Sequence, residues 1–149
     1  METVSKSKLI TSALLLGAAL TLGCFSQITQ AAEPEESAQT VIPSTVAGIW
    51  SSIDKEQAVL AQVIQAGKMD VVHEHAFAIR DLVRALPEHY QELTTEQKQK
   101  LKEDVRFIDI LATRLDQTGD AKDKAGTQSN FRKLEAVLKS IRNQYRIVK

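Results

Sequence analysis

The sequence predicts an all-α protein, an up-down-up-down antiparallel four-helix bundle that follows a signal peptide and a short tether. Apolar residues recur at spacings of three and four through residues 44–149, which is the period of an amphipathic helix. Aromatic residues make up only 5% of the chain, which disfavours a β-sandwich. The connections between the apolar stripes are short, so that consecutive helices are expected to be antiparallel neighbours.

Residues 1–31 are typical of a secretory signal peptide. Lys6 and Lys8 precede an apolar run, residues 9–23, that is too short to cross a membrane comfortably. Small residues then surround a cleavage position after Ala31. The sequence therefore predicts a protein that is exported to the periplasm or secreted.

Cys24 indicates a second route of export. Gly23 precedes Cys24 at the end of the apolar run, as in bacterial lipoproteins, and cleavage before Cys24 would leave a lipid anchor on a membrane there. Cys24 is also the only cysteine of the chain. On either route the folded part is expected to have no disulfide, no cysteine nucleophile and no CxxCH haem attachment.

Residues 32–43 predict a flexible acidic tether that ends at Pro43 and precedes a bundle of residues 44–149. Gly67 is expected to cap the C-terminus of the first helix. The second helix is expected to begin at an Asp70 cap and to end before Pro87. The residues expected to face the core in these two helices are Val46, Ile49, Trp50, Ile53, Leu60 and Ile64, followed by Val72, Ala76, Ile79, Leu82, Val83 and Leu86.

The third helix is predicted to start at a capping box of Thr94 and Gln97 and to stop near Gly119. Asp120 is expected to cap the fourth helix. The inward residues predicted for these helices are Leu101, Val105, Ile108, Leu111 and Leu115, followed by Ala121, Ala125, Phe131, Leu134, Leu138, Ile141 and Tyr145.

The three histidines of the chain include His73 and His75, which raise the question of a metal site. An α-helix turns by about 100° per residue, so these two side chains point about 200° apart and cannot chelate one ion from a regular helix. Met69 lies four residues before His73, and a Met-His pair suits a soft ion such as copper. The candidate metal ligands are therefore Met69, His73 and His75, and the alternative is a pair of solvated surface residues.

His75 lies about 40° from Ile79, the centre of the apolar stripe, and is expected to face the core. Counting through the following turn places it level with Asp104 on the third helix, while Gln57 and Asn130 fall near the seams of the first and fourth helices. These residues predict a buried polar cluster of His75, Asp104, Gln57 and Asn130. Its role is interpreted as structural, with a ligand or metal site as the alternative.

The opposite side of the second helix carries His73, Phe77, Arg80 and Arg84. Phe77 points outward beside two cations, and the four residues form a candidate partner surface. The alternative is an isolated exposed phenylalanine on a solvated face.

Two segments, residues 72–87 (VHEHAFAIRDLVRALP) and 119–138 (GDAKDKAGTQSNFRKLEAVL), resemble small exported helical domains that accompany bacterial metal-efflux systems. The bundle also resembles periplasmic four-helix cytochromes. That comparison fails at the haem site, because the last helix contains no histidine and no CxxCH is present, so haem is disfavoured.

The formal net charge of +0 argues against nucleic-acid binding, which requires a basic face. No nucleophile-base pair, metal triad or phosphate loop is visible in the sequence. The sequence therefore predicts an exported, non-enzymatic protein that binds an envelope partner or assists metal handling. The alternative is a carrier of copper, another divalent ion or a small ligand through the histidines and methionine of the second helix.

Overall fold

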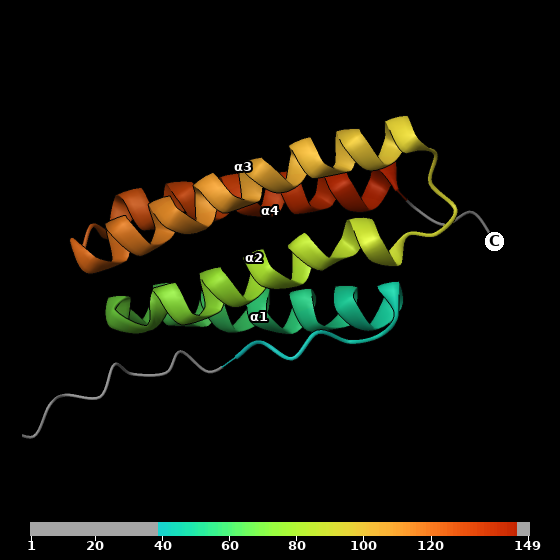
Figure 1. Cartoon of the computed structure of the whole chain (residues 1–149). Coiled ribbons are helices and arrows are strands. Elements are labelled where there is room, and N and C mark those ends of the chain that lie inside the picture. The colour runs from blue at the N-terminus through green and yellow to red at the C-terminus, as the bar shows by residue number, and fades with distance from the viewer. Residues whose placement is uncertain (1–38, 146–149) are drawn as a thin grey trace, which may run out of the picture. The chain divides into compact units, whose positions relative to one another are not determined.

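The computed structural model describes residues 39–145, and within that range it contains helices and no strand (Figure 1). The all-α prediction is thereby confirmed for this part of the chain. The helices are α1 (Val46–Ala66), α2 (Val72–His89), α3 (Thr95–Asp120) and α4 (Lys124–Gln144), with a single 3₁₀ turn, η1 (Met69–Val71), before α2. The predicted signal peptide, the lipid-anchor position Cys24 and the tether up to residue 38 lie outside the described residues.

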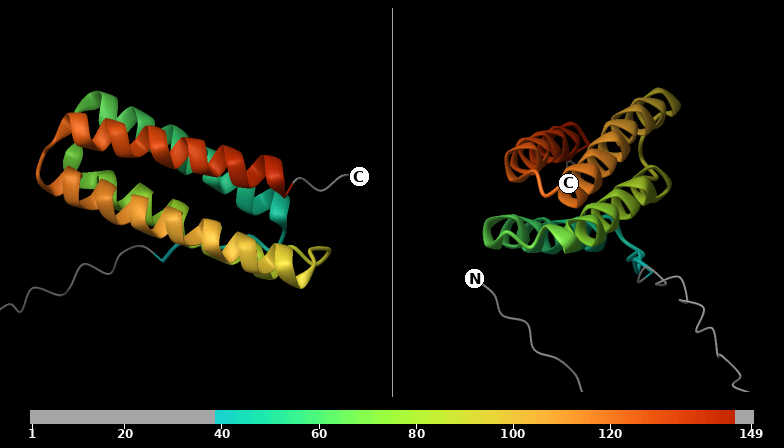
Figure 2. Two further views of the ribbon diagram at one scale, coloured as in Figure 1. Left: turned by 90° about the horizontal axis from the view of Figure 1, so that it is seen from above. Right: turned by 90° about the vertical axis from the view of Figure 1, so that its left-hand side faces the viewer.

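The four helices form two layers, with α1 and α2 in one and α3 and α4 in the other (Figure 2). Each helix packs along its neighbour in the chain, and the chain turns back at every connection (Figure 1). α4 also lies over α1, but these two helices pack less extensively than the three sequential pairs do. None of the described helices is both long enough and apolar enough to span a bilayer.

The core lies between the layers and is built from the predicted apolar stripes. The predicted stripe residues of α2 and α3 are all buried, and in α1 only Val46 is partly exposed. In α4 the predicted residues from Phe131 onward are also buried. Apart from Val46, the stripe positions were therefore correct wherever the helix itself was placed correctly, because burial follows the 3.6-residue period.

Two predicted helix termini are confirmed. Gly67 adopts a left-handed conformation with φ of 74°, and its N–H donates to the carbonyl of Ile64 at 3.2 Å. Thr94 and Gln97 form the full capping box, in which the Thr94 hydroxyl accepts from the Gln97 N–H and the Gln97 side chain accepts from the Thr94 N–H. These contacts satisfy backbone groups that have no partner inside the helix.

Both predicted boundaries of the second helix were wrong. Asp70 does not cap it, because Asp70 lies inside the η1 turn, which runs directly into α2 through a bond from the Val72 N–H to the Met69 carbonyl. α2 also continues through Pro87 to His89. Proline removes one N–H donor, but in the last turn the cost is a single bond, and the Tyr90 N–H still donates to Leu86 at 3.0 Å.

The start of the fourth helix was predicted too early. Asp120 is the last residue of α3, and the cap of α4 is Asp123, whose side chain accepts from the Gly126 N–H at 2.9 Å. Ala121 and Ala125 are exposed, contrary to the prediction that they face inward. Their position follows from the shift in the helix start, because Ala121 belongs to the turn and Ala125 to the first, outer turn of α4.

Candidate functional site

His75 is paired with a residue that the sequence did not indicate. Its Nδ1 lies 2.8 Å from Oε2 of Glu56 on α1, and the two side chains are 22% and 32% exposed. The angle of about 40° from Ile79 did place His75 near the core. That angle does not say which neighbouring helix the side chain approaches, and in the structure it approaches α1 and not α3.

The predicted cluster of His75, Asp104, Gln57 and Asn130 therefore does not form. The hydroxyl of Tyr145, the residue that follows α4, donates to Asp104 at 3.4 Å, and Gln57 donates to Glu135 of α4 at 3.1 Å. Asn130 is buried and donates to the Arg114 carbonyl of α3 at 3.4 Å. Each residue links two helices or a helix and its flanking residue, but the pairs are separate.

The predicted metal ligands Met69, His73 and His75 differ in their surroundings, and metal binding by them stays a prediction. Met69 is buried in the core cluster, whereas His73 is half-buried on α2. The expectation that Met69 and His73 share a side assumed one continuous α-helix, but Met69 belongs to a 3₁₀ turn, which has a tighter rotation per residue. Within residues 39–145, no group of three His, Cys, Asp or Glu side chains is placed to hold a metal ion.

Three residues of the predicted partner surface on α2 make contacts within the fold, and the fourth, His73, is half-buried. Phe77 is half-buried and packs against the core, and the Arg80 guanidinium lies 4.3 Å from its ring centre. Arg80 also donates to Asp81, and Arg84 donates to Asp109 of α3, both at 2.8 Å. Phe77, Arg80 and Arg84 therefore contact neighbouring side chains, and partner binding by this surface stays a prediction.

A cluster of aromatic residues that the sequence did not predict joins the helices at one end of the fold. It contains the only tryptophan and both tyrosines of the chain, Trp50, Tyr90 and Tyr145. The Trp50 Nε1–H donates to the Tyr90 hydroxyl at 3.0 Å, and the rings of Tyr90 and Tyr145 lie 6.2 Å apart. Because Trp50 precedes Tyr90 by 40 residues, no local pattern connects them.

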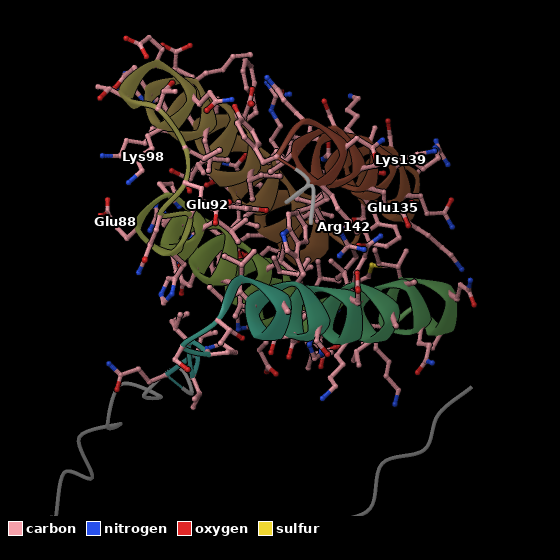
Figure 3. All side chains as sticks on the ribbon, turned by 90° about the vertical axis from the view of Figure 1, so that its right-hand side faces the viewer. Glu88, Glu92, Lys98, Glu135, Lys139 and Arg142 are labelled. Carbon is pink, nitrogen blue, oxygen red and sulfur yellow. The ribbon has the colours of Figure 1, made fainter. Side chains whose placement is uncertain are left out.

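Charged residues complete the aromatic cluster. The Arg142 guanidinium of α4 lies 4.4 Å from the Trp50 ring centre and also donates to Asp54 of α1. Figure 3 shows Glu135 and Arg142 on the side of α4 that faces α1. Burial, together with the neighbouring Asp104 carboxylate, raises the pKa of Tyr145 to about 12. The hydroxyl therefore stays neutral at physiological pH, which suits a structural donor and not an acid-base catalyst.

The outer side of α3 carries an exposed apolar pair that the sequence did not single out. Phe107 is 57% exposed and Ile110 is 48% exposed. Glu103 and Arg114, both exposed, flank them along the same side of the helix. We call these four residues the α3 outer surface. A shallow depression adjoins Ile110 and is lined by Asp109, Ile110, Thr113, Arg114 and Gln117.

The signal for this surface was present in the sequence. Phe107 and Ile110 lie about 100° and about 160° from Ile108, the centre of the buried stripe of α3, so helical geometry alone places them outside it. Single exposed apolar residues are common, but an adjacent pair on one helix face forms a contiguous patch. Comparisons with protein-family models, with curated proteins and with solved structures found no match for this chain.

Proposed function

We propose that this chain is an exported, non-enzymatic up-down-up-down helical-bundle protein of the cell envelope that binds a protein partner through the α3 outer surface. The observation that carries the proposal is the exposed pair of Phe107 and Ile110. Large apolar side chains that adjoin one another on a surface are more often used for contact than isolated ones.

The α3 outer surface replaces the partner surface predicted on α2. Phe77 packs against the core and Arg84 is bound to Asp109, so those side chains already have partners within the fold. Phe107 and Ile110 lie among exposed neighbours and retain about half of their surface in water. Burying that apolar area against a partner is favourable by about 25 cal/mol per Å².

Export through the segment 1–31 is part of the same proposal. Cleavage after Ala31 gives a periplasmic or secreted protein, and cleavage before Cys24 gives a lipid-anchored one. The mass and N-terminal sequence of the protein isolated from cells distinguish the two forms. A protein that retains Met1 and remains in the cytoplasm would contradict both.

A photoreactive amino acid in place of Phe107 tests partner binding in cells. We expect irradiation to produce a protein adduct, because the side chain at this position would lie in the contact. The matched control is the same substitution at Val59 of α1, which is 39% exposed and lies outside the α3 outer surface. Absence of an adduct at 107, or equal adducts at both positions, would contradict the proposed surface.

A carrier of copper or another divalent ion is the alternative to this proposal, and the feature that would favour it is the His75–Glu56 pair, which sets an imidazole beside a carboxylate. Two ligands make a weak site, so we expect titration of the metal-free protein with copper or zinc to give no stoichiometric complex tighter than about micromolar. A tighter complex that is lost in both His75→Ala and Glu56→Gln would establish the carrier. The role in metal handling that the resemblance implies depends on the same titration.

A further inference from the structure

We infer that the partner of the α3 outer surface is a second copy of this chain, bound through antiparallel packing of α3 against α3. The inference deepens the proposed function and rests on it for the use of this surface. It follows from the order of four exposed residues along the helix: Glu103, Phe107, Ile110 and Arg114.

The spacing of these residues is that of a helix-packing seam. They follow one another at intervals of four, three and four, which is the alternation of the a and d positions of a heptad. At about 100° per residue the four side chains fall within about 60° of one another on the helix. The seam extends in both directions through further exposed residues, which are Glu96, Lys100, Gln117 and Ala121.

The order of charged and apolar residues along the seam is complementary to the same order read in the opposite direction. Consider two copies of α3 that lie antiparallel, with the two-fold axis level with the midpoint between Phe107 and Ile110. Phe107 then faces Ile110 of the partner subunit, and Glu103 faces Arg114 of the partner subunit. The two-fold axis repeats each pair, so the contact has an apolar centre and an opposite-charge pair at each end.

Charge also sets the direction of the two helices. In a parallel pair each residue would face its own copy, so that Glu103 would oppose a glutamate and Arg114 an arginine. Like charges set directly opposite disfavour that arrangement. In the antiparallel arrangement Lys100 faces Gln117 of the partner subunit and Glu96 faces Ala121 of the partner subunit, so no layer of the seam opposes like charges.

A shallow depression lies beside the seam. It adjoins Ile110 and is lined in part by Arg114, at the level reached by Glu103 of the partner subunit. A depression at this place permits close approach of a second helix.

The expected association is weak because two large apolar residues per chain form the centre of the contact. Such an interface falls below the size of stable dimers, and a dissociation constant of roughly 10 µM to 1 mM is expected. A dimer of this kind forms where the protein is concentrated.

Sedimentation equilibrium of the protein, purified in the form that cells accumulate, tests the inference at concentrations from about 10 µM to about 1 mM. The expected result is a reversible monomer-dimer equilibrium. The paired substitutions Phe107→Ser and Ile110→Ser are expected to abolish it. Val59→Ser, which also removes an exposed apolar side chain, is expected to leave it unchanged.

Charge reversal tests the register. Glu103→Arg alone or Arg114→Glu alone replaces two attractions with two repulsions and is expected to weaken dimerisation about tenfold. The double variant Glu103→Arg with Arg114→Glu restores both pairs and is expected to recover the original constant within about threefold. The control is the same reversal at Glu88 and Lys102, an exposed ion pair away from the seam, which is expected to have no effect.

Three outcomes would overturn the inference. The first is a dimer that persists in the Phe107→Ser, Ile110→Ser variant, and the second is a double charge reversal that fails to recover association. The third is a monomer at every concentration. If that monomer still forms an adduct with a different protein at position 107 in cells, the proposed function stands and only the identity of the partner is wrong. A monomer without any adduct overturns both.

Discussion

Substitution of Trp50 by alanine is expected to lower the free energy of unfolding by about 3–5 kcal/mol. The indole is only 9% exposed, and it joins α1 to the α2–α3 connection through the Tyr90 hydroxyl and to α4 through Arg142. Alanine would leave a cavity and would remove the donor to Tyr90. Urea unfolding followed by far-UV circular dichroism measures the loss, because the variant has no tryptophan fluorescence.

Trp50→Phe separates the contribution of apolar packing from that of the hydrogen bond to Tyr90. Phenylalanine keeps most of the apolar volume but cannot donate to Tyr90, so a smaller loss of about 1–2 kcal/mol is expected. If Trp50→Ala cost less than about 1 kcal/mol, the indole would not be packed as the structure places it.

The second large effect is expected at Ile108, and a residue two positions away supplies its control. Ile108 is fully buried, whereas Ile110 is 48% exposed on the same helix. We expect Ile108→Ala to lower the free energy of unfolding by about 2–5 kcal/mol, since it leaves a cavity in the core. Ile110→Ala is expected to change it by less than about 0.5 kcal/mol in the monomer.

The comparison of these two variants also tests the function of α3. Urea unfolding at low protein concentration measures the stability of the monomer, and an adduct or dimer assay measures contact. Ile110→Ala is expected to weaken contact while leaving stability intact. Equal destabilisation by both variants would place Ile110 in the core and would remove the α3 outer surface.

Much of the fold could be predicted because its main determinant is periodic. The stripe of α2 from Val72 to Leu86 is buried as predicted, and so is the stripe of α3 from Leu101 to Leu115. Burial on one face of a helix depends on local sequence spacing, so it can be derived before any contact is known. The capping box of Thr94 and the glycine cap at Gly67 were predictable for the same reason.

The predictions that failed involve choices between competing local patterns. Asp70, Asp120 and Asp123 are all suitable caps, and only Asp123 is used. A cap requires the preceding chain to be extended or turned, and that geometry depends on how the connection packs. Pro87 likewise ends a helix only if the chain turns before it, and here its ring is buried within the last turn of α2.

The candidate sites were the least predictable features because they depend on contacts between helices. Counting residues through the turn placed His75 and Asp104 at similar heights along the bundle, but it does not tell which neighbouring helix each side chain approaches. In the structure their partners are Glu56 and Tyr145. Trp50 and Tyr90 are 40 residues apart and meet only after α1 and α2 have packed. The seam of Glu103 to Arg114 is readable in the sequence, but its exposure depends on which faces of α3 the other helices cover.

The sequence by itself determined that the described part of the chain is all-α, where the buried stripes run and how two of the helices are capped. These properties follow from backbone hydrogen bonding and from the 3.6-residue period, which are both local. The tertiary structure alone decided that His75 contacts α1, that Met69 enters the core and that Phe107 and Ile110 remain exposed. The physical reason is that the rotation of each helix about its axis is set jointly by all its neighbours, so the partner of any one side chain depends on the whole fold.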